Sequence, residues 1–583
     1  MRGSRGTQSH CERSEAIQGS RSWIASPPLR ACAGIAARND EVKAASLGRY
    51  QPMKTAPARI WTRSICGLVV LCLSWQALAQ PDTHAPPAEP QPVAAPTQGS
   101  PHSGLEQPGH ATREETRGAS AGEQHRLPPD SITRHTLELP GRTLRFTAAA
   151  GSIRLDGRDG KPQAEIAYIA YALEGADPAA RPISFALNGG PGMASAWLHL
   201  GGLGPWRLPM HPEALSPSAT PAVVDNTETW LDFTDLVFID PAGTGYSRLI
   251  DPSDEARRRF FSVDGDIGSL AEFVRRWLEA NNRVPSPKFF VGESYGAFRG
   301  PPLVRNLESE QGIGIGGMVL LSPVLDFQML TSDDNPLWWV ARLPSMAAAA
   351  RAATGAVERA WLADAESYAA GDYLRDLLRG WGDAAAVARM SARVAELTGL
   401  DPGLVRRRGG RIDAHTFDRE FYRPQGRIGS AYDATVTTAD PDPSSESGRY
   451  ADPFLQGLSV PLTSAMLDLY ASRLAWHPEG QYRLANSAAY EQWNWGRGLK
   501  APEALDSLRR VLALDSQLHV LVEQGLTDLV TPYFGTELLL HQLPDFGPGR
   551  VRFVVHPGGH MFYLRDASRA ALRDEAQAMI GGR

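Results

Sequence analysis

Residues 289–297 read Phe-Phe-Val-Gly-Glu-Ser-Tyr-Gly-Ala, an apolar run that ends in Gly-Glu-Ser-Tyr-Gly. The pattern Gly-x-Ser-x-Gly predicts a serine on a sharp turn between a buried strand and a helix. Glycine has no Cβ, so a glycine on either side of this turn leaves the hydroxyl of Ser294 accessible. The unpaired N–H groups at the start of the helix favour negative charge that develops beside it. The stretch therefore predicts a nucleophilic serine, provided that its surroundings supply a base.

Continuous apolar runs on both sides of this turn predict further strands that are buried on both faces. The runs are Ile183–Leu187, Leu236–Ile239, Met318–Leu321, Leu518–Val522 and Val551–Val555. Between them, Ile267–Leu278 has helical spacing, and Asp566–Ile580 reads as an amphipathic C-terminal helix. Strands that alternate with helices predict an α/β fold with a mainly parallel central sheet. The loops after such strands are expected to meet at the carboxyl edge of the sheet.

Shorter β-prone segments precede the parallel part of the predicted sheet. They are Thr136–Leu139, Arg142–Ala148, Ser152–Leu155 and Glu165–Tyr171, and glycine or aspartate separates them. This pattern predicts a series of antiparallel hairpins.

The first 130 residues contain three segments that we expect to stand apart from the fold. Residues 53–79 have a basic start, the apolar run Ile65–Leu73 and the sequence Ala77-Leu78-Ala79, which predicts a signal peptide cleaved between Ala79 and Gln80. This apolar run is too short to cross a bilayer, so no membrane anchor is expected. Residues 1–52 are expected to be untranslated or unstructured, and residues 80–130, rich in Pro, Ala and Gly, are expected to form a disordered linker.

Charge and cysteine content narrow the classes of function. The net charge of −6 argues against a nucleic-acid partner, and the hydrophobic content of 42% supports a substantial core. The four cysteines, at positions 11, 32, 66 and 72, all precede Gln80, so the processed chain would have no thiol nucleophile. An export signal on a cysteine-free body predicts a bacterial periplasmic or secreted protein. No metal-ligand spacing or phosphate-binding loop is found, so we expect neither a metal nor a cofactor.

Residues 331–500 differ in composition from the segments around them. Ala347–Leu362 and Ala384–Leu397 read as helices, and half of the chain's 14 tryptophans lie in this part. We interpret it as a helical cap inserted into a catalytic domain made of residues 131–330 and 501–583. Its tryptophans either line a substrate pocket or, as we expect for most of them individually, simply pack in a core.

A serine hydroxyl is a weak nucleophile until a base takes its proton and a carboxylate orients that base. Asp528 and His560 both follow predicted strands after the serine turn. The order Ser294, Asp528, His560 is that of α/β-hydrolases. Each residue alone could be an ordinary loop or cap residue, but their order and placement predict a catalytic triad.

The chain resembles the serine carboxypeptidase family, peptidase family S10, and among its members the bacterial ones. The residues that carry this resemblance are Asn188–Gly192, Asp235–Tyr246, Gly292–Gly296, Gly525–Asp528 and Gly558–Met561. Glu293 before the serine and Tyr295 after it distinguish this turn from that of a generic esterase.

The resemblance implies a role for each residue of these motifs. Ser294 would be the nucleophile, His560 the general acid and base, and Asp528 the residue that orients it. The backbone N–H groups of Gly190 and Tyr295 would form the oxyanion hole. The terminal carboxylate of a peptide would be held by Asn188 and Gly189 together with Glu293, which would act as a protonated acid because two facing carboxyl groups resist joint ionisation.

One position departs from the family pattern. Family carboxypeptidases carry a second glutamate in a Glu-Leu-Gly-Pro segment, where this chain has Gly202-Leu203-Gly204-Pro205. Either a group from the cap replaces that acid, or the enzyme prefers less acidic conditions or a different acyl substrate.

The expected function is that of an exported serine carboxypeptidase that releases C-terminal residues from peptides through an acyl-enzyme. An esterase or acyltransferase that uses the same triad is the first alternative, because of Gly202. A non-catalytic binding protein with this fold is the second. The only partner expected is a peptide with a free C-terminus.

Overall fold

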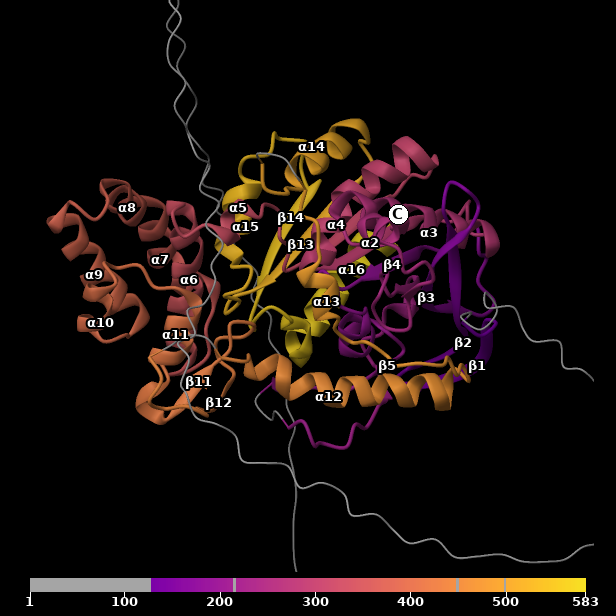
Figure 1. Ribbon diagram of the computed structural model, residues 1–583, viewed down its shortest axis with the longest axis horizontal. Helices are drawn as coiled ribbons and strands as arrows, with labels where there is room; N and C mark the ends of the chain where they lie inside the picture. The colour runs from indigo at the N-terminus through magenta and orange to yellow at the C-terminus, as the bar shows by residue number, and fades with distance from the viewer. Residues whose placement is uncertain (1–126, 213–215, 447–449, 497–499, 583) are drawn as a thin grey trace, which may run out of the picture. The chain divides into compact units, whose positions relative to one another are not determined.

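The computed structural model describes residues 127–212, 216–446, 450–496 and 500–582, which belong to one compact unit (Figure 1). The predicted signal peptide, the segment before it and the linker up to residue 126 lie outside the described residues. None of the described helices is long and apolar enough to span a membrane.

A ten-stranded sheet forms the centre of the fold, in the order β1-β2-β3-β7-β4-β9-β10-β13-β14, with β8 paired to β3. The strands from β7 to β14 in this order run parallel, and β1, β2, β3 and β7 pair antiparallel. The strands are β1 (Ser131–Leu139), β2 (Arg142–Asp156), β3 (Pro162–Leu173), β4 (Ile183–Leu187), β7 (Asp235–Ile239), β8 (Arg248–Leu249), β9 (Lys288–Glu293), β10 (Gly317–Leu321), β13 (His519–Gly525) and β14 (Val551–His556). The prediction of an α/β-hydrolase fold with a mainly parallel sheet is confirmed.

Helices cover both faces of the sheet. Successive side chains of each strand point to opposite faces, so the two faces contribute to two different hydrophobic cores. In β9, Phe290 packs in one hydrophobic core with α3, α4 and α14, whereas Phe289 and Val291 pack in a second core with α12 and α16. These helices are α3 (Val263–Ala280), α4 (Tyr295–Asn306), α12 (Pro453–Asp468), α14 (Leu505–Leu514) and α16 (Asp566–Gly581). Burial on both faces explains why these strands read as continuous apolar runs.

The strand β2 differs from the prediction, which separated Arg142–Ala148 from Ser152–Leu155. The structure has one continuous strand that passes through Gly151, opposite Tyr168 of β3. A Cβ at Gly151 would lie 2.0 Å from Oδ1 of Asp130. Glycine is therefore required here by the close approach of a distant carboxylate and does not end the strand.

The chain between β10 and β13 is mainly helical (Figure 1). Its α-helices are α5 (Gln328–Thr331), α6 (Pro336–Ala352), α7 (Ala363–Tyr368), α8 (Leu374–Arg379), α9 (Ala384–Thr398), α10 (Pro402–Arg407), α11 (Ala414–Glu420), α12, α13 (Ser487–Glu491) and α14. Buried residues of α6 to α11 share a third hydrophobic core with α15 (Tyr533–Leu540), whereas α12 packs against the sheet. The helix expected over Ala347–Leu362 is interrupted after Ala352, where Gly355 has a low helix propensity, and a short turn at Arg359–Leu362 follows.

Candidate active site

Ser294 occupies a strained turn between β9 and α4. Its backbone angles are φ 61° and ψ −125°, which non-glycine residues rarely adopt. A Cβ at Gly292 would lie 2.4 Å from the carbonyl oxygen of Gly296, and one at Gly296 would lie 2.3 Å from that of Leu187. Both glycines are therefore needed for steric reasons, and the predicted strand–turn–helix is confirmed.

Asp528 and His560 lie in the loops after β13 and β14, and their side chains meet. Nδ1 of His560 lies 2.8 Å from Oδ2 of Asp528, and both side chains are buried. The other carboxylate oxygen of Asp528 accepts hydrogen bonds from the backbone N–H groups of Val530 and Thr531, at 2.8 and 2.9 Å. Asp528 is thus fixed in orientation and can hold the imidazole ring with Nε2 directed away from it.

Two further residues support this pair. The hydroxyl of Thr531 lies 2.7 Å from Oδ2 of Asp528 and 3.0 Å from Nδ1 of His560. The ring of Tyr432 packs edge-on against the imidazole, with ring centroids 5.3 Å apart. Neither residue was predicted. The spacing Asp528 to Thr531 is that of an Asp side chain that caps its own turn, so it offered a signal for Thr531. Tyr432 comes from the inserted segment, where no sequence pattern points to it.

Glu293 lies between Asn188 and His560. Its Oε2 accepts a hydrogen bond of 2.7 Å from Nδ2 of Asn188, and its Oε1 lies 3.0 Å from Nε2 of His560. Burial lowers the pKa of His560, but Asp528 and Glu293 together outweigh burial and raise that pKa to about 10. Both carboxyl groups therefore favour the protonated form of the imidazole.

Asn188 begins the glycine loop that lies against the serine turn. Its carbonyl oxygen accepts a hydrogen bond of 2.7 Å from the buried Arg299 of α4, and its Oδ1 accepts one of 2.9 Å from the N–H of Leu198. A Cβ at Gly189 would lie 2.6 Å from the backbone nitrogen of Tyr295. Only glycine permits this approach, which brings the loop of Gly189 and Gly190 beside the first turn of α4. Arg299 was not predicted, because a charged residue inside a helix is ordinarily exposed.

The side chain of Tyr563 packs against Gly202, the position where the family pattern has a second glutamate. A Cβ at Gly202 would lie 3.5 Å from Cδ2 of Tyr563, which is fully buried. Burial, together with the charge of Glu293, raises the pKa of Tyr563 well above its usual value, so the hydroxyl stays protonated. A neutral aromatic side chain thus fills the space beside Gly202. The sequence gives no signal for this contact, because the two residues are far apart in the chain.

One cavity of about 710 Å³ contains Ser294 and His560. Seven of the eight predicted site residues line it: Asn188, Gly189, Gly190, Glu293, Ser294, Tyr295 and His560. Asp528 is fully buried behind His560. The inserted segment contributes another part of the wall, including Trp338, Arg342, Asp413, Tyr432, Asp452 and Tyr490. Most tryptophans of that segment do not line it; Trp476 and Trp493 are buried, and Trp361 and Trp381 are exposed.

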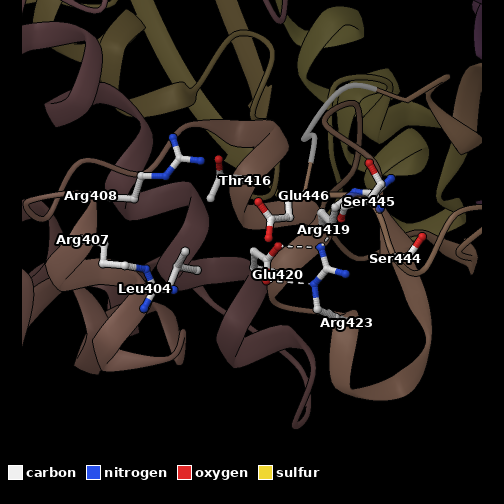
Figure 2. A pocket seen from close by; sticks show the side chains of 10 residues that line it. All are labelled: Leu404, Arg407, Arg408, Thr416, Arg419, Glu420, Arg423, Ser444, Ser445 and Glu446. Atoms are coloured by element: carbon white, nitrogen blue, oxygen red, sulfur yellow. Dashed lines mark hydrogen bonds and ion pairs between the residues drawn. The ribbon is translucent and has the colours of Figure 1, made fainter.

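A second hollow, of about 470 Å³, lies within the inserted segment and is rich in arginine (Figure 2). Arg423 pairs with Glu420 at 2.7 Å, and the buried Arg419 pairs with Asp440 at 3.0 Å. The exposed Arg407 and Arg408 line its rim. No residue of the serine site lines this hollow, and no cluster of three or more potential metal ligands is found among the described residues.

Comparison with known proteins identifies a family for part of the chain. Residues 140–353 match the model of the serine carboxypeptidase family. This match includes the glycine loop and the serine turn and ends before Asp528 and His560. Serine carboxypeptidase-like 13 of Arabidopsis thaliana is 29% identical over 153 residues, which are 26% of this chain and 34% of that protein. Serine carboxypeptidase-like 11 of the same plant is 30% identical over 173 residues, 27% of this chain and 36% of that protein.

The chain thus spans about a third of the length of these curated relatives. Two solved structures are similar to part of this chain. A prohormone-processing carboxypeptidase of Saccharomyces cerevisiae is 14% identical, with a TM-score of 0.46, over 75% of this chain and 92% of that one. Proline iminopeptidase of Mycobacterium smegmatis is also 14% identical, with a TM-score of 0.35, over 74% of this chain and 99% of that one.

Proposed function

We propose that this chain, whose residues 140–353 match the model of the serine carboxypeptidase family, is a serine carboxypeptidase that releases C-terminal residues from peptides. The observation that carries the proposal is the cavity in which Ser294, on its strained turn, shares one space with a histidine that is paired to a buried aspartate. These groups are those required for nucleophilic attack on an acyl carbon.

In the proposed reaction, the hydroxyl oxygen of Ser294 attacks the carbonyl carbon of the last peptide bond. His560 takes the serine proton and passes it to the leaving nitrogen as the C–N bond breaks, which leaves an acyl ester on Ser294. A water molecule then loses a proton to His560 and attacks the ester, and the serine leaves with that proton. Asp528 stabilises the imidazolium in both steps.

The N–H groups of Gly190 and Tyr295 are proposed to stabilise the negative charge on the carbonyl oxygen. The proposal is supported by the close packing of the glycine loop against the start of α4, since a Cβ at Gly189 would lie 2.6 Å from the nitrogen of Tyr295. Loss of one such hydrogen bond typically costs about 3 kcal/mol of transition-state stabilisation.

The terminal carboxylate of the peptide is proposed to bind near Asn188, Gly189 and Glu293. The amide of Asn188 donates a hydrogen bond to Glu293, and both residues line the cavity beside Ser294. Glu293 would carry a proton when the peptide carboxylate is bound, because two adjacent anions repel.

An esterase or acyltransferase that uses the same residues is the alternative, and one observation favours it. The side of the site where a second acid is expected has Gly202 and the buried ring of Tyr563 instead. A site with only one such acid would be less selective for substrates that have a free C-terminal carboxylate.

Matched substrates separate the two functions. We expect a blocked dipeptide with a free C-terminus to be cleaved much faster than the same dipeptide as its C-terminal amide. Equal cleavage of acid and amide, with faster turnover of the corresponding ester, would support the esterase and contradict the carboxypeptidase.

The proposed setting is outside the cytoplasm, in a bacterial periplasm or secreted. The support is the predicted signal peptide of residues 53–79 and the absence of cysteine after Gln80. The residues from 331 to 500 are proposed to act as a cap that shapes the substrate cavity, since several of its wall residues come from there.

A further inference from the structure

A buried arginine from α6 lines the active-site cavity without a carboxylate partner. Arg342 is 5% exposed and shares the cavity with Ser294 and His560. Its Nη1 donates a hydrogen bond of 3.0 Å to the carbonyl oxygen of Trp338, and its guanidinium stacks 3.8 Å from the centroid of that ring. Among the described residues, Nε of Arg342 has no hydrogen-bond partner, and no carboxylate forms an ion pair with it.

The acidic residues of the cavity wall interact with other protein groups and do not pair with Arg342. They already accept hydrogen bonds from the protein: Glu293 from Asn188, Asp413 from Thr416, and Asp452 from Ser430 and Ala431. Burial lowers the pKa of Arg342 to about 10, and the more distant charges of Asp528 and Asp413 oppose that effect. Arg342 therefore keeps its charge at neutral pH although it is removed from water.

A buried guanidinium without a counter-ion is costly unless a ligand pairs with it. The planar, forked group fits a carboxylate through two parallel hydrogen bonds, and its stacking on Trp338 fixes the plane of the fork. The chain also has Gly202 at the position where the family pattern has an acid that could hold a carboxylate by sharing a proton. A cation from α6 that lines the same cavity would bind a carboxylate in its ionised form.

We propose that Arg342 binds a carboxylate of the substrate and so gives the enzyme a preference for anionic substrates at neutral pH. This inference rests on the proposed function, because it assigns the substrate class of the same site. Two sources offer this chemistry: the terminal α-carboxylate of the peptide, and the side chain of an acidic residue beside the scissile bond.

Two pairs of blocked dipeptides distinguish these sources. The first pair ends in alanine as the free acid or the amide, and the second ends in glutamate amide or glutamine amide. We expect the change Arg342→Met to reduce the ratio of kcat/KM for the anionic over the neutral member by about 10- to 100-fold, mostly through KM. A fall in the first ratio assigns the α-carboxylate, and a fall in the second assigns the acidic side chain.

Two variants make this comparison specific. Arg342→Lys keeps the charge but loses the forked geometry of the guanidinium, so part of the preference for anionic substrates should return. This variant also keeps the test informative if the methionine variant does not fold. Arg351→Met makes the same change at an exposed position of the same helix and should leave both ratios at their wild-type values. Unchanged ratios in a folded Arg342→Met protein would overturn the inference.

A binding measurement separates this inference from the proposed function. In the full chain carrying Ser294→Ala, calorimetric titration with the free-acid dipeptide should give a Kd about 10- to 100-fold weaker when Arg342→Met is added. One outcome is that the wild-type protein hydrolyses none of the substrates, while the difference in Kd is still found. The carboxylate site then stands and the peptidase proposal falls. If hydrolysis is found and neither the ratios nor the Kd change, the peptidase proposal stands and the role of Arg342 falls.

Discussion

His560 has a carboxylate at each ring nitrogen, with Asp528 on Nδ1 and Glu293 on Nε2. The two carboxylates favour the imidazolium, which cannot accept a proton from a serine, so the fraction of His560 that is available as a base rises with pH and rises further when Glu293 is neutralised. In the proposed reaction, binding of a substrate carboxylate would have the second effect, because it would favour the protonated form of Glu293. Substrate binding and activation of the base would then be coupled through one residue.

The change Glu293→Gln tests this coupling. A nearby carboxylate raises the pKa of a histidine, so removal of that charge lowers the pKa, and neutral His560 is present at lower pH. For a neutral ester substrate, we expect the rising limb of kcat/KM against pH to move down by about one pH unit or more. The isosteric change Glu310→Gln at an exposed position should leave the profile in place. A limb that stays fixed or moves to higher pH in Glu293→Gln would contradict the role assigned to Glu293.

The serine turn depends on backbones that approach each other closely. A strand, a loop and a helix meet at Gly296, where the carbonyl oxygen of Leu187 leaves no room for a side chain. The helix α3 offers a contrast, since a Cβ at Gly268 would have no neighbour within 4 Å. The same substitution at these two glycines should therefore have opposite effects.

We expect Gly296→Ala to destabilise the protein by about 3 kcal/mol, because neither backbone can move away without disturbing the sheet. Gly268→Ala should stabilise it by about 0.5–1 kcal/mol, since alanine loses less backbone entropy in a helix. Urea unfolding followed by circular dichroism measures both. Equal stability of Gly296→Ala and the wild type would show that the turn is less tightly packed than described.

The elements around the site were predictable where local sequence determines them. Short apolar runs that end in loops form the parallel strands, which are β4, β7, β9, β10, β13 and β14. The sheet could therefore be predicted from the sequence. The positions of Asp528 and His560 in loops after strands could be predicted for the same reason. The continuity of β2 through Gly151 was not predictable, because it depends on Asp130, which precedes the strand and folds back onto it. Tyr563 beside Gly202 and Arg342 beside the cavity likewise depend on contacts between distant segments.

The molecule as a whole buries several carboxyl groups that lack full compensation. Burial raises the pKa of Asp240 from 3.8 to about 7, despite a hydrogen bond from the N–H of Ser195 that acts in the opposite direction. Burial, with the charges of Asp452, Asp413 and Asp433, raises the pKa of Asp418 well above 3.8, and neither oxygen of that side chain has a hydrogen bond among the described residues. These groups hold their protons more tightly in the folded chain than in the unfolded chain.

Stability should therefore fall as pH rises. An acid with a raised pKa contributes most below its unfolded pKa, near 4, and its contribution is lost as pH passes through the folded value. His560 acts in the same direction, because its raised pKa stabilises the fold until pH passes through about 10. We expect Tm to be higher at about pH 5 than at about pH 8, by about 2 °C or more.

The change Asp418→Asn mimics the protonated acid and should reduce this dependence on pH. Thermal unfolding of the wild type and Asp418→Asn across this range gives the comparison. A Tm that rises with pH in the wild type, or an unchanged slope in the variant, would contradict the assignment of these buried acids.

Covalent labelling shows whether Ser294 is a nucleophile that His560 and Asp528 activate. A fluorophosphonate probe should label the folded full-length protein, and peptide mass spectrometry should place the adduct on Ser294. Labelling should disappear in Ser294→Ala and slow by orders of magnitude in His560→Ala, because the serine then lacks its base. A folded wild-type protein that takes no label, or labels at another residue, would contradict the account and favour a binding protein with this fold.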